Sequence, residues 1–450
     1  MRVRFPASAL ALALIFAACD TAAPESDGLS DEATAEEYAA DALADGVSTE
    51  APALTGSVGL AADSSDLVVV FVPSVLDPVL ASDVVFTGQD VRRRGYIQET
   101  QPAVAIRVPT VLLPILMPVL EASPLVERVE DDIVFAIPAL ELGPEPYVPQ
   151  RHDYTGAAED LLLGEDPSFS GQMRPWSMKT IGANRSSAAS GDGQGETPVD
   201  VYVIDSGVSH SDLNVVESVA FYEGSDPGSD LHGTHVAGII GAIDDGDGAV
   251  GVAPGARIHS LDVFGGNETA SMSQIMRAVD HVVAAKRANP STPMVINLSL
   301  SAYVGTTAFN ALDETVQAAI DERIPVVIAA GNGSANAAAF SPAHVRDAIV
   351  VGAADSDFNF AFDFSNRGLH VDLLAPGVRV VSTGDGDRYA RLDGTSMAAP
   401  HVTGAVALIL SATPNASPAS VQGTVKRNGR NKVTVRPPRT TPRILWIARL

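Results

Sequence analysis

Short, continuous apolar runs alternate with segments of helical periodicity between Arg174 and the C-terminus. Such runs suit strands that are buried on both faces, and the longer amphipathic segments suit helices. Strands are predicted at 199–204, 257–263, 294–300, 325–330 and 348–353, and helices at 233–243, 273–288, 308–323 and 396–410. This alternation predicts an α/β fold, with a parallel sheet covered by helices on both faces.

A second apolar pattern lies upstream, between residues 56 and 138. Strands are predicted at 67–72, 103–108 and 125–132, and a helix at 112–120. Pro114 and Pro118 are expected to break or kink that helix, because proline removes a helical hydrogen bond. The order strand, strand, helix, strand predicts a small α+β domain that precedes the larger one.

The N-terminus has the pattern of an export signal. Arg2 and Arg4 precede an apolar run, 10–18, that is too short to span a bilayer as a stable helix. The next residues, Phe-Ala-Ala-Cys ending at Cys19, resemble a bacterial lipobox, although Phe stands where Leu is usual. Acylation of Cys19 would anchor the protein at the cell envelope. The alternative is ordinary secretory cleavage, which discards Cys19 and releases the protein.

Two further stretches have compositions that do not favour a packed core. Residues 20–50 are rich in Ala, Glu, Asp and Ser without one Lys or Arg, which is typical of a disordered tether. Residues 141–171 are rich in Pro, Gly and acidic side chains, as expected of an exposed linker that proteases can reach. The chain is therefore divided into signal peptide, acidic tether, small domain, linker and large domain, at 1–18, 19–55, 56–138, 139–173 and 174–450.

Charge and cysteine content narrow the possible functions. The chain holds 55 acidic and 29 basic side chains, a formal net charge of −26 at pH 7. Nucleic acid repels such a chain, so it is not an expected partner. Cys19 is the one cysteine, so no intrachain disulfide can stabilise the fold. The basic segment 426–443 is interpreted as a solvated face that balances local acidity.

Three short motifs offer the members of an Asp/His/Ser catalytic system. Asp205 ends Val-Ile-Asp after a predicted strand, His232 begins His-Gly-Thr-His, and Ser396 lies in Gly-Thr-Ser-Met-Ala where a predicted helix starts. A serine hydroxyl needs an adjacent base, and a histidine oriented by an aspartate can serve. Asp, His, Ser is one of three known chain orders for this system. Together the motifs predict a serine endopeptidase.

Each residue alone also has an ordinary structural interpretation. Ser396 could cap a helix, and Asp205 could belong to a turn at a strand end. His232 and His235 might suggest a metal pair, but the zinc motif places its histidines four apart with a glutamate beside the first. The metal interpretation is therefore not favoured. At a helix N-terminus, the backbone N–H of Ser396 is free to face a developing oxyanion.

The three motifs are similar to the signatures of the subtilase family, over about residues 174–450. The segments that carry the resemblance are 205–207, 232–238 and 394–402. Three more segments agree: 251–256 leads to one strand that borders the substrate groove, 296–300 resembles the other bordering strand, and 329–332 resembles the oxyanion segment. The spacing from Asn332 to Gly368 is most similar to the proteinase K branch. The small domain, which ends in Val-Glu-Arg-Val-Glu-Asp-Asp, resembles the inhibitory propeptide of subtilases.

The resemblance assigns roles to single residues. Asp205 is the orienter, His232 the base and acid, Ser396 the nucleophile and Asn332 the oxyanion donor, while His235 is structural. The implied substrate-binding residues are Gly265, Ser299, Leu300, Ser301 and Gly331. The family usually has Gly-Gly where Ser301-Ala302 stands, so cleavage preference does not carry over.

The implied protein is an exported, self-processing zymogen, a monomer held inactive by its own propeptide and acting on peptide and protein substrates. The alternative from another class is a catalytically inactive module that keeps the fold and only captures peptides.

Structural calcium is also implied by the resemblance. Asp212 and the loop 244–248, with Asp245, match a calcium site of subtilisins, and Asp372 matches a calcium carboxylate of the proteinase K branch. Calcium takes several oxygen ligands, including carboxylates and loop carbonyls. The alternative interpretation of the loop is a solvated acidic segment in an already acidic protein.

Overall fold

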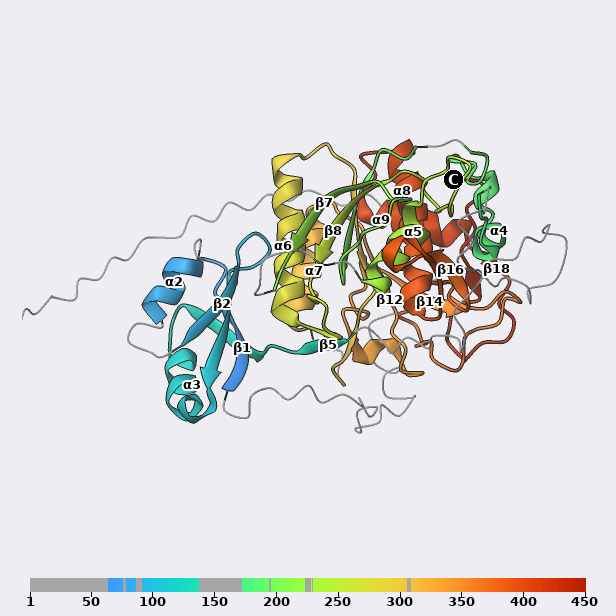
Figure 1. The fold of residues 1–450 in the computed structure, drawn as a ribbon. Helices are drawn as coiled ribbons and strands as arrows, with labels where there is room; N and C mark the ends of the chain where they lie inside the picture. The colour runs from blue at the N-terminus through green and yellow to red at the C-terminus, as the bar shows by residue number, and fades with distance from the viewer. Residues whose placement is uncertain are drawn as a thin grey trace, which may run out of the picture.

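A computed structural model describes residues 64–75, 78–85, 91–136, 172–193, 196–222, 228, 230–305 and 309–450. They form a small N-terminal unit beside a larger one (Figure 1). The predicted signal peptide and tether, at 1–18 and 19–55, lie outside the described residues. Of the predicted linker, 139–173, the structure describes only Gln172 and Met173, and both pack with the larger unit.

The N-terminal unit is an antiparallel sheet with helices, as the α+β prediction requires. Its described strands have the order β2-β3-β1-β4. The elements are β1 (Ser64–Phe71), α2 (Pro78–Val85), β2 (Arg92–Ile97), β3 (Ala103–Pro109), η1 (Thr110–Leu112), α3 (Leu113–Glu121) and β4 (Val126–Asp131). Helix α3 continues through Pro118, because Leu116 and Leu120 bury its apolar face against the sheet. Strand β2 is missed by the apolar pattern because three arginines begin it.

The larger unit is built on a parallel sheet. Among the described residues nine strands have the order β18-β19-β15-β14-β12-β10-β6-β8-β7, and every neighbouring pair but β18–β19 is parallel. The strands are β6 (Asp200–Asp205), β7 (Val215–Ala220), β8 (Arg257–Asp262), β10 (Met294–Leu298), β12 (Val326–Ala329), β14 (Ile349–Ala354), β15 (Leu373–Pro376), β18 (Arg430–Asn431) and β19 (Arg443–Ile444). The predicted α/β architecture is confirmed.

Helices cover both faces of this sheet. The helices are α4 (Trp176–Ile181), α5 (Leu231–Gly241), α6 (Met272–Ala288), α7 (Ala311–Asp321), α8 (Thr395–Ala412) and α9 (Pro418–Asn428). Strand residues alternate between two cores: Val201 and Val203 pack with α5 and α8, whereas Tyr202 and Ile204 pack with α6 and α7. Burial on both faces explains the continuous apolar runs. Helix α8 is apolar and long enough to cross a membrane, but 89% of it is buried in the core.

Shorter elements connect the strands and helices. They are β5 (Val134–Ala136), β9 (Thr269–Ser271), β11 (Ala302–Tyr303), β13 (Phe340–Ser341), β16 (Val380–Thr383), β17 (Tyr389–Leu392), and the turns η2 (Ala183–Arg185), η3 (Ala337–Ala339) and η4 (Asp385–Asp387). Strand β10 ends at Leu298, two residues earlier than predicted. Ser299 leaves the sheet there and contacts the start of α8 instead. Ligands of open parallel sheets bind at this edge.

Candidate active site

Asp205 and His232 form a buried pair at the carboxyl edge of the sheet. Asp205 is the last residue of β6, and His232 lies in the first turn of α5 behind the N-cap Asp230. The Nδ1 atom of His232 lies 2.7 Å from Oδ1 of Asp205, and both residues are only 1% exposed. Such a carboxylate holds the proton on Nδ1 and leaves Nε2 as the basic atom. The backbone N–H of Ser206 donates to the same Oδ1 and fixes the carboxylate.

Ser396 stands at the beginning of α8, which packs against α5. Its hydroxyl donates to the carbonyl of Ser299 over 3.1 Å, and the Ser299 hydroxyl donates to the carbonyl of Ser396 over 3.0 Å. Among the described residues no hydrogen bond joins Ser396 to His232. Catalytic hydrogen bonds often form or shorten only when substrate binds. The missing bond therefore does not argue against a pairing of the Ser396 hydroxyl with His232.

The side-chain nitrogen of Asn332 and the backbone nitrogen of Ser396 both lie close to Gly394. Oδ1 of Asn332 accepts hydrogen bonds from the Thr395 N–H (2.9 Å) and hydroxyl (2.7 Å), which orients the amide. A Cβ added at Gly394 would lie 3.1 Å from Nδ2 of Asn332 and 3.5 Å from N of Ser396. Gly394 has a φ of +148°, which side chains rarely adopt. Glycine therefore leaves open a space where two donors converge, as an oxyanion requires.

His235 is held in a structural role. Its Nε2 atom lies 3.1 Å from the carbonyl oxygens of both Val380 and Ala390, so the ring joins α5 to β16 and β17. Complete burial lowers the pKa of His235 to about 3, which keeps the ring neutral. Of the two histidines in the motif, only His232 has a carboxylate partner suited to a catalytic base.

The residues expected to bind substrate lie on three segments, which follow β8, β10 and β12. Ser299, Leu300 and Ser301 follow β10, and Ala136 of the N-terminal unit forms an antiparallel bridge with Ser301. On its other side Ala136 pairs with Thr269 of β9, so β5 lies between the two segments. Gly265 lies in the turn between β8 and β9.

Gly331 and Ser301 face one another. A Cβ added at Gly331 would lie 2.9 Å from Oγ of Ser301. The Ser301 side chain, which replaces a usual glycine, therefore occupies space beside the oxyanion segment.

Asp212 lies in a region rich in oxygen atoms. Its Oδ2 accepts hydrogen bonds from the Ala249 N–H (2.7 Å) and the Tyr389 hydroxyl (3.2 Å). Burial raises the pKa of Asp212 to about 7, and the charges of Asp245 and Asp247 act in the same direction. A buried carboxylate with acidic neighbours favours a cation.

Gln172 completes this region, and sequence reasoning missed it. Its Nε2 donates to the carbonyls of Ile243 (2.9 Å) and Ala249 (3.4 Å), while its Oε1 is buried with no hydrogen-bond partner. No motif marks Gln172; a backbone hydrogen bond from Met173 to Gly248 brings it to the loop. No cluster of three His, Cys, Asp or Glu side chains suited to a metal occurs among the described residues, so a metal bound here would also need amide and carbonyl oxygens.

Asp244 and Asp372 have other partners. Asp244 accepts hydrogen bonds from the N–H groups of Gly191 (2.7 Å) and Gly193 (2.9 Å), which fixes that turn. Asp372 forms an ion pair with Lys426, whose Nζ lies 2.9 Å from Oδ1. The expectation that the basic segment 426–443 is only a solvated face therefore does not hold for Lys426.

Comparisons with known proteins agree with this geometry. The subtilase family model matches residues 196–440. Subtilisin DY from Bacillus licheniformis is 37% identical over 268 residues, 58% of this chain and 93% of that protein. Subtilisin Savinase from Lederbergia lenta is 36% identical over 258 residues, 57% of this chain and 91% of that protein.

A solved structure is similar as well. The crystal structure of a cold adapted subtilisin-like serine proteinase has a TM-score of 0.53 and 32% sequence identity, and the match covers 60% of this chain and 97% of that chain. The present chain belongs to the subtilase family and is a serine-type endopeptidase with a subtilisin-like α/β fold.

Proposed function

We propose that this endopeptidase cleaves peptide bonds through an acyl-enzyme on Ser396. Oγ of Ser396 attacks the substrate carbonyl while Nε2 of His232 takes the hydroxyl proton. The C–N bond then breaks, and His232 returns that proton to the leaving amine. Water, deprotonated by the same nitrogen, attacks the ester, releases the acid and restores Ser396. Asp205 orients His232 and stabilises its imidazolium form throughout.

The observation that carries this proposal is the convergence of Asn332 Nδ2 and Ser396 N beside Gly394. These donors suit the charge that develops in the transition state, so they favour catalysis over mere capture of peptides. Replacement of Asn332 by Ala should lower kcat about a hundred- to a thousandfold, with KM nearly unchanged. A higher KM at unchanged kcat would assign Asn332 to ground-state binding instead.

The nucleophile is tested directly. Ser396→Ala should abolish labelling by a fluorophosphonate and lower turnover by about six orders of magnitude, the loss known for a subtilisin nucleophile. Ser411→Ala is the matched control, because Ser411 is an exposed serine at the other end of the same helix. Labelling that persists in Ser396→Ala would contradict the assignment of Ser396 as the nucleophile. No labelling of the wild type would favour the alternative, a catalytically inactive module that only binds peptides.

We infer that the N-terminal unit is an inhibitory propeptide. Strand β5 pairs with β9 in the register Val134↔Ser271 to Ala136↔Thr269 and bridges to Ser301, which are the contacts expected of a substrate backbone. The side chain of Phe135, at the centre of this strand, is completely buried. An occupied substrate path supports inhibition by the unit that precedes the protease.

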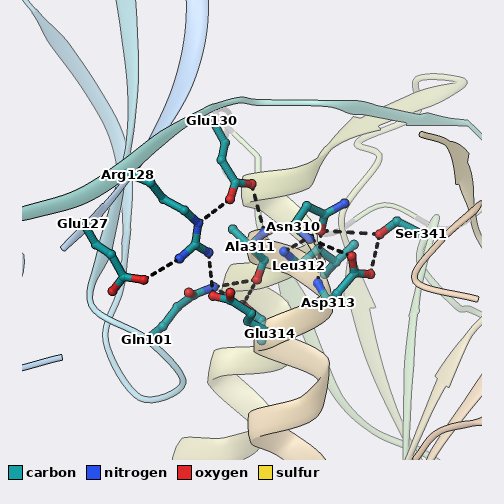
Figure 2. Close-up of polar contacts among 11 residues, drawn as sticks. Gln101, Glu127, Arg128, Glu130, Asn310, Ala311, Leu312, Asp313, Glu314 and Ser341 are labelled. Atoms are coloured by element: carbon teal, nitrogen blue, oxygen red, sulfur yellow. Dashed lines mark hydrogen bonds and ion pairs between the residues drawn. The ribbon is translucent and has the colours of Figure 1, made fainter. Parts of the chain in front are cut away.

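Two carboxylates of this unit sit at helix N-termini, where N–H groups lack helical partners. Figure 2 shows Glu130 accepting from the N–H of Ala311 at the start of α7 (2.9 Å), while Arg128 contacts both Glu130 and Glu314 (2.5 Å each). Asp132 likewise accepts from the N–H of Ser273 at the start of α6 (2.8 Å). The unit is thus seated on both helices that cover one face of the sheet.

The proposed zymogen cleaves itself in the linker between residues 138 and 174, after export. The Ser396→Ala precursor, expressed alone in a host lacking other exported proteases, should stay full length. Normal processing of that variant would refute self-cleavage. The N-terminal sequence and mass of the exported protein distinguish acylation of Cys19, with anchoring at the envelope, from secretory cleavage and release.

We further propose that Gln172, Asp212 and Asp245 hold a structural calcium ion together with the carbonyls of Ile243 and Ala249. In that state the amide of Gln172 is turned about its last bond, so that Oε1 rather than Nε2 faces these carbonyls. These oxygens suit the ligand preferences of calcium, and the orphaned Oε1 of Gln172 gains a partner. The ion would offset the acidic charges and tie the start of the protease domain to the loop 244–248.

A further inference from the structure

Asp372 is surrounded by donors that come from α9. Its side chain is 11% exposed. Oδ1 lies 2.9 Å from Nζ of Lys426, and Oδ2 accepts from the Val350 N–H (3.0 Å) and from Nε2 of Gln422 (3.4 Å). Gln422 and Lys426 are four residues apart on α9, so both side chains extend from one face of the helix.

The same glutamine also engages two backbone carbonyls. Nε2 of Gln422 donates to the carbonyl oxygens of Ala348 (2.8 Å) and Arg346 (3.1 Å). One carboxylate and two carbonyls around a common point are the kind of oxygen atoms that calcium takes as ligands. In this chain, however, the amide NH₂ of Gln422 faces the two carbonyls and Oδ2 of Asp372, and the ammonium group of Lys426 faces Oδ1.

A calcium ion does not fit beside this ammonium group. Lys426 holds one full positive charge in contact with the only carboxylate that these contacts supply, and a second cation would be repelled. Burial raises the pKa of Asp372, and the charge of Lys426 opposes that shift. The ammonium group therefore supplies the compensating charge that a buried carboxylate needs.

We propose that Lys426 and Gln422 replace a metal ion here: the side chains of α9 join Asp372 to the segment 346–348 and make this region independent of calcium. The interactions are internal to the folded chain, so they do not depend on the concentration of any ion. The proposal does not depend on the catalytic assignments. It predicts a latent site, because removal of the ammonium group frees Oδ1 of Asp372, and the uncharged amide of Gln422 can then turn its oxygen toward an ion.

The test counts calcium ions on the full-length Ser396→Ala protein, which cannot digest itself. Isothermal titration of chelator-treated protein with calcium chloride gives a stoichiometry, and thermal melting gives the shift in Tm. Lys426→Ala should bind one more calcium ion than its parent, whether the parent binds one or none, and adding Asp372→Asn should abolish that extra ion. Lys432→Ala, which removes an exposed lysine from the same segment, should change neither readout.

Two outcomes would overturn the proposal. One is loss of a calcium ion from the parent when Asp372→Asn is introduced with Lys426 in place. The other is a folded Lys426→Ala protein that gains neither a bound ion nor a calcium-dependent rise in Tm. If Lys426→Ala folds only with calcium, the proposal is supported. If it folds under neither condition, Lys426→Gln, which keeps length and a donor but no charge, is judged by the same two readouts.

Discussion

Two acidic regions of the protease domain differ in what the fold brings to the carboxylate. Asp212 lies under the electrostatic influence of Asp245 and Asp247, and it shares the neighbour Ala249 with Gln172, whose amide oxygen has no hydrogen-bond partner. Asp372 meets the ammonium group of Lys426. The sequence resemblance predicts calcium at both aspartates, yet only the first region has excess negative charge. The comparison teaches that a carboxylate is no evidence of a metal until its neighbours are known.

The largest expected effect is removal of calcium from the wild-type protein. An ion at a hundred times its dissociation constant stabilises the folded state by about 2.7 kcal/mol, so excess chelator should lower Tm markedly. The double variant Asp212→Ala/Asp245→Ala should lose this shift, whereas Asp372→Asn should keep it. Scanning calorimetry in calcium and in chelator makes the measurement. If the double variant keeps the full calcium-dependent shift in Tm, the ion is bound at another place in the protein.

The second effect concerns the ammonium group of Lys426, which pairs with Asp372. Lys426→Met in chelator should lower the free energy of unfolding by about 1–3 kcal/mol, because Asp372 is left without its charged partner. Lys432→Met should cost almost nothing, since its side chain is exposed. Urea unfolding with and without calcium separates the two regions. Equal losses for both lysines would mean that the ion pair contributes little.

A smaller effect compares the glutamine of each region. Gln172→Ala should weaken calcium binding about tenfold, or about 1.4 kcal/mol, because one oxygen ligand is lost. Gln422→Ala should leave calcium affinity unchanged, since its amide serves Asp372 and two carbonyls instead. Titration calorimetry on the Ser396→Ala background provides both values. An unchanged affinity in Gln172→Ala would remove it from the ligand set.

The smallest effect is a pH dependence confined to the first region. The pKa of Asp212 is raised to about 7, so protons compete with calcium for this carboxylate below that pH, and calcium affinity should fall. Without calcium, lowering the pH has the opposite effect and stabilises the folded chain. The folded chain holds a proton that the unfolded chain lacks between about pH 4 and 7, so this group adds stability as pH falls. A flat calcium affinity from pH 8 to 5.5 would contradict the raised pKa.

Much of the proposed catalytic centre could be predicted from sequence, because each of its residues lies in a short local motif. Asp205, His232 and Ser396 each lie at the end of a strand or the start of a helix, and parallel strands bring such positions to one edge. The alternation of apolar runs with amphipathic segments likewise indicated the sheet and both helical layers, because this pattern is also local in the sequence. Edge strand β7 and the arginine-rich β2 were missed, since half-buried strands carry no continuous apolar run.

The sequence by itself determined the fold class, the family and the residue types of the catalytic system. Only the tertiary structure decided which groups surround each of the two aspartates. Gln172 reaches Asp212's neighbours through a backbone contact of Met173, and Lys426 reaches Asp372 from a helix beyond the catalytic serine. Charge compensation depends on distances of a few ångströms, and residues so far apart in the chain acquire those distances only when the elements pack.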